Sequence, residues 1–294
     1  MKIGLTGATG FIGRYLLPRL IDGNELVITT SNDKISKWDN VKYVKVDYSA
    51  EQYVQAFAGC EAVIHLGARI QHDLKIKRQT FEMYKGNITS SDNVLYACKE
   101  CGITNVVLAS SIAVYHKDSG VIYDEESETI PLTYYGYSKV CCEKLAEMYN
   151  NNFNMHIKSL RLGYVYGYND NPEVQNSLLM YFLELAKKGE PLPVFGDGSS
   201  ANVYIYIKDA VDAIICAMNR PDVSGAFNIA NPKCTTALEF AEAFCRVFPG
   251  LEIKMIPEKR VTGAEWELSG EKAREILGFS TKYSVMDAIH DMSE

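Results

Sequence analysis

The chain has 294 residues, of which 47% are hydrophobic and 23% are charged. These proportions are those of an ordinary globular protein, and they exclude a disordered, collagen-like or fibrous chain. The formal net charge of −7 predicts that nucleic acid is not a partner, because affinity for a phosphate backbone comes mainly from lysine and arginine.

The first half of the chain alternates short apolar segments with segments of helical spacing. Strands are predicted over residues 2–6, 26–30, 41–46, 62–66, 105–110 and 155–162, and helices over residues 10–21, 51–57, 81–101 and 139–150. Apolar strands separated by helices are typical of a buried parallel sheet with right-handed crossovers. The predicted fold is therefore α/β, a doubly wound parallel sheet of the Rossmann type, with ligands at the carboxyl ends of its strands.

The pattern becomes less regular after residue 167. Residues 168–174 are polar and predicted to form a loop, residues 178–188 are predicted to form a helix, and residues 191–202 are rich in turn residues. Tyr204 and Tyr206 alternate along a further predicted strand and are expected to pack on one face. We therefore predict an NAD(P)-binding Rossmann domain over residues 1–166 and a smaller substrate-binding lobe over residues 167–294, interwoven with the sheet domain because no linker separates them.

Neither the N-terminus nor any apolar stretch indicates export or a membrane. The first apolar run is short and is broken at Gly4 and Gly7, and no stretch reaches the ~18–20 apolar residues that a membrane span needs. The sequence predicts a cytoplasmic protein, with no membrane partner and with its cysteines as free thiols. Cys98 and Cys101 form a Cys-x-x-Cys, but no second pair has ligand spacing, so no metal is predicted.

A glycine-rich turn follows the first predicted strand and opens the first predicted helix. Glycines permit a tight turn and a close approach of backbone to a pyrophosphate, and the helix N-terminus offers N–H groups with partial positive charge. The strand–turn–helix context predicts a dinucleotide site here. Its candidate residues are Gly7, Thr9, Gly10, Phe11, Ile12 and Gly13.

The choice between NAD and NADP depends on the end of the second strand. An acidic residue about 20 positions after the turn would bind the ribose hydroxyls of NAD, but Thr30 and Ser31 occupy this stretch. Their small side chains leave room for a 2′-phosphate, and Arg14 or Lys34 could pair with it, which favours NADP. Asp33 lies slightly later, and a shifted loop would restore the NAD interpretation.

Asp47 and Tyr48 follow the third predicted strand. At that place in a doubly wound sheet a side chain can reach the adenine of a dinucleotide. An exposed loop carboxylate is the equally simple alternative for Asp47, and both interpretations stay open at this point.

Tyr135 and Lys139 form a Tyr-x-x-x-Lys sequence on a predicted helix. Four residues make about one turn, so both side chains lie on one face. A lysine ammonium beside a phenol favours the phenolate, which makes a tyrosine usable as an acid or base near neutral pH. Ser110 and Ser111 end a strand at the sheet edge where ligands bind, and a serine hydroxyl there can hydrogen-bond the reacting oxygen.

These motifs, in this order, resemble the extended short-chain dehydrogenase/reductases, the group of NAD(P)-dependent sugar-nucleotide epimerases and dehydratases. The resemblance covers nearly the whole chain. Beyond the glycine turn and the Tyr135/Lys139 pair, the matching segments are His65-Leu66-Gly67-Ala68, Asn87-Ile88-Thr89, Ser110 to Tyr115, Arg161 to Gly167, Gly196-Asp197-Gly198-Ser199, Asp209 and Leu277-Gly278-Phe279.

The resemblance implies roles for particular residues. The implied catalytic set is Ser111, Tyr135 and Lys139. Leu66, Gly67 and Ala68 would line the nicotinamide ring and its ribose, and Asn87 would support the long helix or a proton relay. The resemblance also implies a homodimer in which the helices after the fourth and fifth strands pack against a second subunit; burial within one chain is the alternative for those helices.

Three departures from the family pattern narrow the reaction. Dehydratases of the group place Asp-Glu directly after the catalytic hydroxyl residue, whereas this chain has Ile112 and Ala113, which cannot move protons. Sugar-nucleotide 4,6-dehydration is therefore not expected. Tyr164 replaces a common asparagine, and Asn202 replaces the arginine that grips the substrate diphosphate, so both are candidates for the substrate wall.

The loss of that arginine leaves two interpretations open. Other groups, such as Arg69, Lys75 or Arg260, hold the diphosphate, or the substrate is not a nucleotide sugar. His116 also replaces a common glycine, and a loop histidine of this kind is expected to be solvated rather than catalytic.

The predicted function is an NAD(P)-dependent oxidoreductase acting on a small molecule, with a nucleotide sugar as the leading substrate class. The sugar would be epimerised at a carbinol carbon or reduced from a 4-keto form. Tyr135 would exchange the proton of the substrate hydroxyl or ketone, Ser111 would orient the oxygen, and Lys139 would tune Tyr135 and hold the ribose. A ketoreductase for another small carbonyl compound and a non-catalytic NAD(P) sensor are the alternatives.

Overall fold

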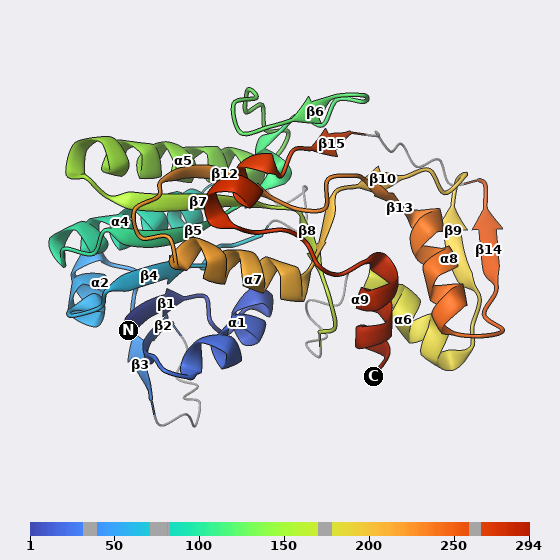
Figure 1. The fold of residues 1–294 in the computed structure, drawn as a ribbon, viewed down its shortest axis with the longest axis horizontal. Helices are drawn as coiled ribbons and strands as arrows, with labels where there is room; N and C mark the ends of the chain where they lie inside the picture. The colour runs from blue at the N-terminus through green and yellow to red at the C-terminus, as the bar shows by residue number, and fades with distance from the viewer. Residues whose placement is uncertain (32–39, 71–80, 82, 170–177, 259–265) are drawn as a thin grey trace.

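A seven-stranded parallel sheet forms the centre of the molecule in the computed structural model, which describes residues 1–31, 40–70, 81, 83–169, 178–258 and 266–294 (Figure 1). Its strands are β1 (Lys2–Thr6), β2 (Glu25–Thr30), β3 (Val41–Lys45), β4 (Ala62–His65), β5 (Asn105–Ser111), β7 (His156–Leu162) and β12 (Gly225–Ile229). The spatial order is β12-β7-β5-β4-β1-β2-β3, so successive strands are added toward one edge from β1 to β3 and toward the other edge from β4 onward. This order confirms the predicted doubly wound fold, whose ligands bind at the carboxyl ends of the strands beside such a reversal.

Helices cover both faces of the sheet (Figure 1). On one face α1 (Phe11–Ile21) and α7 (Ile207–Met218) pack against the strands, and on the other lie α2 (Ala50–Phe57), α4 (Ser90–Glu100) and α5 (Tyr134–Phe153). Because both faces are covered, the central strands are buried on both sides rather than on alternate residues, and every residue of β4 is buried. This explains why apolar runs predicted the strands of the first half of the chain, whereas β12 was not predicted.

Two helices differ from their predicted bounds. The segment predicted as one helix over residues 81–101 contains a π-helix, Tyr84–Thr89, before α4 begins at Ser90. Helix α5 starts before residue 139, because the Thr133 hydroxyl caps it by accepting a hydrogen bond of 3.0 Å from the Gly136 N–H. Both Tyr135 and Lys139 therefore belong to its first turns.

The rest of the chain forms a smaller lobe at the carboxyl edge of the sheet and at one end of the molecule (Figure 1). Its helices are α6 (Leu178–Lys188), α8 (Ala237–Val247) and α9 (Val285–Ser293). A short helix at Ile112–Val114 follows β5, and another at Ala273–Leu277 packs against the sheet core beside α7 and β12. Its paired strands are β6 (Ile122–Tyr123) with β15 (Glu267–Leu268), β8 (Tyr164–Tyr166) with β11 (Tyr204–Tyr206), β9 (Leu192–Phe195) with β14 (Ile253–Ile256), and β10 (Ala201–Asn202) with β13 (Thr235–Thr236).

One prediction for this lobe is corrected and one is confirmed. The turn-rich stretch 191–202 contains strands β9 and β10, and β9 is stabilised by a parallel partner, β14, that lies far away in the sequence. The predicted strand with Tyr204 and Tyr206 exists as β11, and both rings pack against Tyr166, with centroids 6.1 and 5.4 Å away. Residues 170–174 of the predicted loop lie outside the described part of the chain.

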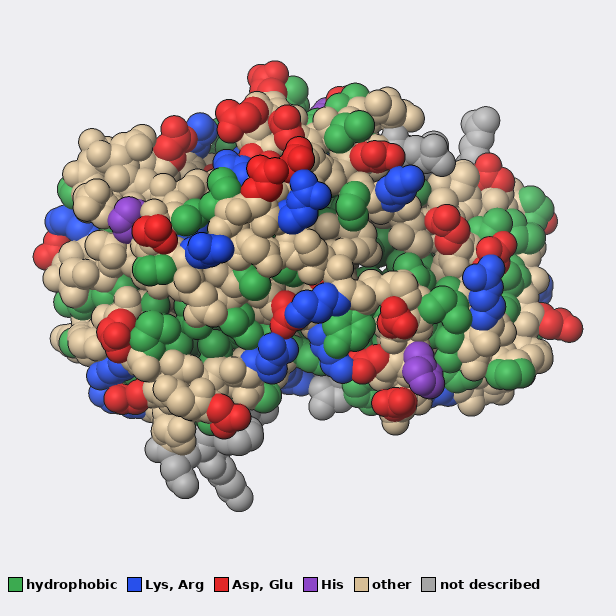
Figure 2. Space-filling model, viewed as in Figure 1, with side chains coloured by type: hydrophobic (Ala, Val, Ile, Leu, Met, Phe, Trp, Pro, Cys, Tyr) green, Lys and Arg blue, Asp and Glu red, His purple; other side chains and the backbone are tan. Residues whose placement is uncertain are grey.

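The second half of the chain is interwoven with the first, because β12 pairs with β7 and α7 packs against the core beside α1. The boundary at residue 166 stays a prediction. No helix among the described residues is long and apolar enough to cross a membrane. On the face in Figure 2 basic and acidic side chains are interspersed, and acidic ones gather at the top, where Figure 1 places the β6 segment.

Candidate active site

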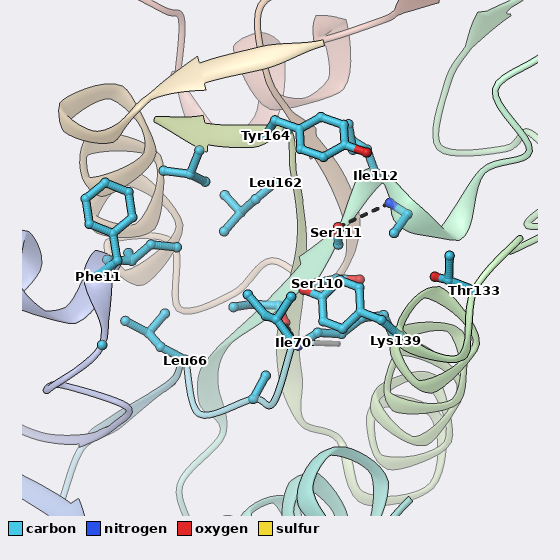
Figure 3. A pocket seen from close by; sticks show the side chains of 18 of the residues that line it. Phe11, Leu66, Ile70, Ser110, Ser111, Ile112, Thr133, Lys139, Leu162 and Tyr164 are labelled. Atoms are coloured by element: carbon cyan, nitrogen blue, oxygen red, sulfur yellow. Dashed lines mark hydrogen bonds between the residues drawn. The ribbon is translucent and has the colours of Figure 1, made fainter. Parts of the chain in front are cut away.

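A cavity of about 610 Å³ lies at the carboxyl ends of β1, β4 and β5, beside the start of α5. Figure 3 shows Phe11 and Leu66 on one side of it, Ser111, Thr133 and Lys139 on the other, and Tyr164 at the top. Many of the predicted site residues meet here although they come from five separate segments. Those in its lining are Gly7, Gly10, Phe11, Ile12, Gly13, Leu66, Ala68, Ser111, Tyr135, Lys139 and Tyr164.

The glycine turn has the geometry that a dinucleotide needs. Gly7 adopts a left-handed conformation with φ of 73°, and a Cβ atom on it would lie 2.7 Å from the backbone nitrogen of Gly67. The N–H of Gly10 donates to the Gly7 carbonyl at 3.0 Å, and α1 begins directly after Gly10 with no side-chain capping bond. The helix N–H groups thus stay available to a phosphate beside a backbone cradle that a side chain would fill, so these residues fit the pyrophosphate of NAD(P).

A buried histidine fixes the two strand ends next to this turn. His65 Nδ1 is 2.6 Å from Thr6 Oγ1 and its Nε2 is 3.0 Å from Ser91 Oγ, while the N–H of Gly67 donates to Thr6 Oγ1 at 3.1 Å. Burial, together with the charge of Lys139, lowers the pKa of His65 to about 3. The ring is therefore neutral at physiological pH and acts as a structural link between β1 and β4.

Tyr135 and Lys139 enter the cavity from the first turns of α5. Lys139 is buried, its Nζ donates to the carbonyl of Ala109 at 2.7 Å, and Nζ lies 5.7 Å from the centroid of the Tyr135 ring. Gly136, between them, lets α5 approach the opposite wall, because a Cβ atom there would lie only 2.1 Å from the Ala113 carbonyl oxygen. The glycine brings Tyr135 toward the segment that carries the predicted serine.

The two serines at the end of β5 have different surroundings. The hydroxyl of Ser110 donates to the carboxylate of Glu143. Ser111 Oγ accepts a hydrogen bond of 3.2 Å from the N–H of Ala113, shown as the dashed line in Figure 3, and this bond leaves the hydroxyl proton for another acceptor. Of the two, Ser111 is the one able to donate to a substrate oxygen in the cavity.

Behind Ser110 lies a buried ion pair. Arg161 Nη2 is 2.8 Å from Glu143 Oε2, with both side chains less than a tenth exposed, and Arg161 Nη1 donates to the Tyr115 hydroxyl at 2.7 Å. Burial raises the pKa of Tyr115 to about 12 although Arg161 and Asn228 oppose it. Tyr115 lines the cavity, but its hydroxyl stays protonated and bonded in this network, so it is not an acid/base candidate.

Other predicted cofactor residues lie outside this lining but mostly at the same sheet edge. They are Thr9, Thr30, Ser31, Asp47, Tyr48 and Gly67. The exposed carboxylate of Asp47 accepts from the Ser49 N–H at 2.9 Å, and the bonds to Ser49 lower the pKa of Asp47. This contact matches the loop interpretation and leaves the adenine interpretation untested. Asp33 and Lys34 lie outside the described residues.

Asn87 and Asn202 also stand apart from the lining. Buried Asn87 accepts from the Arg69 N–H at 2.7 Å and donates to the Arg69 carbonyl and the Ser138 hydroxyl, both at 3.0 Å. These bonds tie the segment after β4 to α5, and both predicted roles of Asn87 stay predictions. Asn202 lies in β10 and contributes no charge near Tyr164.

The sequence interpretation missed one cation of the cavity. Lys117 lines it, and its Nζ donates to the Tyr164 hydroxyl at 3.0 Å. Of the groups expected to hold a diphosphate, Arg69 is not in the lining, while Lys75 and Arg260 lie outside the described residues. In the sequence, the only unusual feature of this loop was His116, next to Lys117. The position of Lys117 itself was not predictable, because it depends on the backbone conformation of this residue, whose φ is 71°.

Comparison with known proteins identifies the family of the chain. The profile of the NAD dependent epimerase/dehydratase family matches residues 3–230. The chain belongs to that family. The predicted resemblance is thereby confirmed, and the family is one of NAD-dependent enzymes.

Relatives of this epimerase/dehydratase chain span several activities. The trifunctional UDP-glucose 4,6-dehydratase/UDP-4-keto-6-deoxy-D-glucose 3,5-epimerase/UDP-4-keto-L-rhamnose-reductase of Arabidopsis thaliana is 28% identical over 96% of this chain and 44% of the relative. The chain therefore spans less than half of that relative's length. A UDP-N-acetylglucosamine 4-epimerase structure from Bacillus cereus is 29% identical, with a TM-score of 0.86 over 100% of this chain and 98% of that one.

The fold is also that of a Bacillus cereus UDP-glucuronic acid 4-epimerase solved with UDP-glucuronic acid and NAD. The TM-score is 0.84 at 22% identity, over 100% of this chain and 98% of the other. The family's description and this complex both name NAD. Neither supports the preference for NADP that Thr30 and Ser31 led us to expect.

Proposed function

We propose that this chain is an NAD-dependent UDP-sugar 4-epimerase with Tyr135 as its acid/base. The observation that carries the proposal is the composition of one cavity. Ser111, Tyr135 and Lys139 line it together with the glycine turn, and none of the described residues in its lining is Asp or Glu. Inversion at a carbinol carbon needs one group that exchanges one proton, whereas dehydration needs a second acid or base.

Each step then falls to a residue of the cavity wall. The glycine turn would hold NAD, which would supply the acceptor and donor for a hydride at C4 of the sugar. Tyr135 removes the proton of the 4-hydroxyl during oxidation and gives it back during reduction, so the protons balance over the cycle. Lys139 favours the phenolate of Tyr135 and binds the nicotinamide ribose, and Ser111 donates to the 4-oxygen.

The test is conversion of defined sugars. Purified protein with added NAD is incubated with UDP-glucose, UDP-N-acetylglucosamine or UDP-glucuronic acid, and the 4-epimer is quantified by chromatography. We expect one of these pairs to reach the same final ratio from either epimer without accumulation of reduced cofactor. Absence of any 4-epimer from all three sugars would contradict the proposal.

For the cofactor we propose NAD rather than NADP. The NAD named for the family and for the solved relative supports this choice, whereas the small residues Thr30 and Ser31 support NADP. Mass spectrometry of the protein as purified, followed by titration with each dinucleotide, decides between them. Tighter binding of NADP by tenfold or more would reverse the assignment.

A reductase is the second candidate, and the observation that favours it is the UDP-4-keto-L-rhamnose-reductase activity in the name of the plant relative. Such an enzyme consumes reduced cofactor in proportion to product and releases it each cycle. Stoichiometric loss of NADH or NADPH absorbance with a 4-keto sugar, and no epimerisation, would favour this candidate.

We also propose a homodimer formed by α4 and α5. The support is a set of large apolar side chains exposed on these helices, namely Tyr96, Tyr134, Tyr137, Met148 and Phe153. Burial of such a surface is a common driving force for association. Light scattering after size-exclusion chromatography should give twice the 32.9 kDa chain mass, and a monomer at micromolar concentration would contradict this interface.

A further inference from the structure

The cavity holds a second cation whose charge the proposed reaction does not use. Lys139 already has its place in the proposed reaction beside Tyr135, whereas Lys117 lies on the wall formed with Tyr164. Lys117 Nζ donates to the Tyr164 hydroxyl at 3.0 Å and lies 4.8 Å from the centroid of that ring and 5.9 Å from the ring of Trp266. A neutral hydroxyl and two π faces orient an ammonium without cancelling its charge.

The nearest carboxylate in the sequence is held by other groups. Asp118 Oδ1 is 2.6 Å from His116 Nδ1, and Asp118 Oδ2 accepts from the Tyr123 hydroxyl at 2.9 Å. No acidic side chain in the described part of the chain forms an ion pair with Lys117. The ammonium therefore faces the cavity without a counter-ion from these residues.

The backbone holds Lys117 there at a cost. Its φ of 71° lies in the left-handed region, which is unfavourable for a residue other than glycine. The contacts of His116 and Tyr123 with Asp118 close the loop around this conformation. Strained residues of this kind concentrate at ligand sites, because the surrounding structure determines their position.

We infer that Lys117, oriented by Tyr164, binds an oxyanion of the substrate. On the proposed function this oxyanion is either the diphosphate of a UDP-sugar or a carboxylate on the sugar, and both accept hydrogen bonds from an ammonium. Lysine serves such groups as a compact point charge. Lys117 would also supply, from a different loop, the positive charge that is lost where Asn202 replaces the arginine of the family pattern.

The test compares binding by three variants with that of the wild type. Calorimetry with NAD-saturated protein measures the dissociation constants of UDP, UDP-glucose and UDP-glucuronic acid. We expect Lys117→Met to weaken binding tenfold or more and Lys117→Arg to stay within about threefold, because arginine keeps the charge. Lys187→Met is the matched control, since Lys187 also lies over a tyrosine ring, that of Tyr168, outside the described cavity lining.

The three ligands separate the two sources of the oxyanion. Equal weakening of all three by Lys117→Met identifies the diphosphate, and weakening of UDP-glucuronic acid alone identifies the sugar carboxylate. Affinity for the weakened ligands should also depend less on salt in Lys117→Met than in the wild type. Unchanged melting temperature and NAD affinity establish that the variant is folded.

Two outcomes overturn the inference: Lys117→Met binds all three ligands like the wild type, or the wild type binds none of them. Measuring the turnover of the wild type distinguishes a failure of the oxyanion site from a failure of the epimerase assignment. If it converts no UDP-sugar but Lys117→Met loses affinity, the oxyanion site stands and the epimerase assignment fails. If it epimerises a sugar and Lys117→Met binds normally, only the site assigned to Lys117 fails.

Discussion

Lys139 Nζ donates a hydrogen bond of 2.7 Å to the carbonyl oxygen of Ala109, and this bond joins the second turn of α5 to the carboxyl end of β5. The same ammonium lies 5.7 Å from the centroid of the Tyr135 ring. One buried charge thus connects the helix that carries the proposed acid/base with the strand that ends in Ser111. The cavity wall is therefore held together by the lysine that lies beside the proposed acid/base.

Replacing Tyr135 with phenylalanine should abolish turnover and preserve the fold. The variant loses the proton-exchanging hydroxyl but keeps the ring that lines the cavity, so we expect the turnover number to fall by about 10²–10⁴-fold. NAD affinity should change little. Tyr137→Phe is the matched control, because Tyr137 lies on the same helix, is 61% exposed and is absent from the described lining. Full turnover by Tyr135→Phe would remove Tyr135 from the mechanism.

Gly136→Ala should destabilise the protein and reduce its activity. The new Cβ atom would lie 2.1 Å from the Ala113 carbonyl oxygen, so α5 and the segment after Ser111 must separate. Overpacking of this kind costs about 1–3 kcal/mol of the free energy of unfolding. Urea denaturation measures that cost. Gly270→Ala is the control, since no atom lies within 4 Å of the position of its Cβ, and equal stability of the two variants would refute the close approach.

His65 should make the folded state sensitive to acid. Burial lowers its pKa from 6.5 to about 3, so between these values the unfolded chain binds a proton that the folded chain does not. The free energy of unfolding should fall as pH drops through this window, by up to about 1.4 kcal/mol per pH unit from this residue alone. His65→Asn should show a shallower slope in denaturation curves measured from pH 7 to pH 4. A slope identical to that of the wild type would mean that His65 titrates normally when folded.

Breaking the buried ion pair Glu143–Arg161 should lower the free energy of unfolding more than breaking an exposed ion pair does. Glu143→Gln leaves the Arg161 guanidinium buried without a counter-ion and weakens the bond to Ser110, and breaking a buried pair costs about 3–5 kcal/mol. Glu147→Gln, on the same helix, breaks an exposed pair with Lys144 and should cost less than about 1 kcal/mol. If chemical denaturation gave the same free energy of unfolding for both variants, the buried pair would stabilise the fold no more than the exposed pair does.

Features that depend on local sequence were predicted well. The glycine turn was recognisable because tight turns and helix N-termini need particular residues at fixed spacing, and Tyr135 and Lys139 because one helical turn brings them together. The missed features depend on distant partners. Strand β9 forms because β14 pairs with it, and Lys117 enters the cavity because its loop turns back through a left-handed residue.

The sequence by itself therefore predicted the strands of the sheet other than β12, the dinucleotide turn and the candidate acid/base, since hydrophobic period and motif spacing are encoded in contiguous residues. Only the tertiary structure decided which of two adjacent serines can donate to a ligand, and which lysine faces the cavity without a counter-ion. Those outcomes depend on Glu143 approaching Ser110 and on Tyr164 approaching Lys117. Such contacts join residues more than thirty positions apart, and they arise only when the folded backbone brings their segments together.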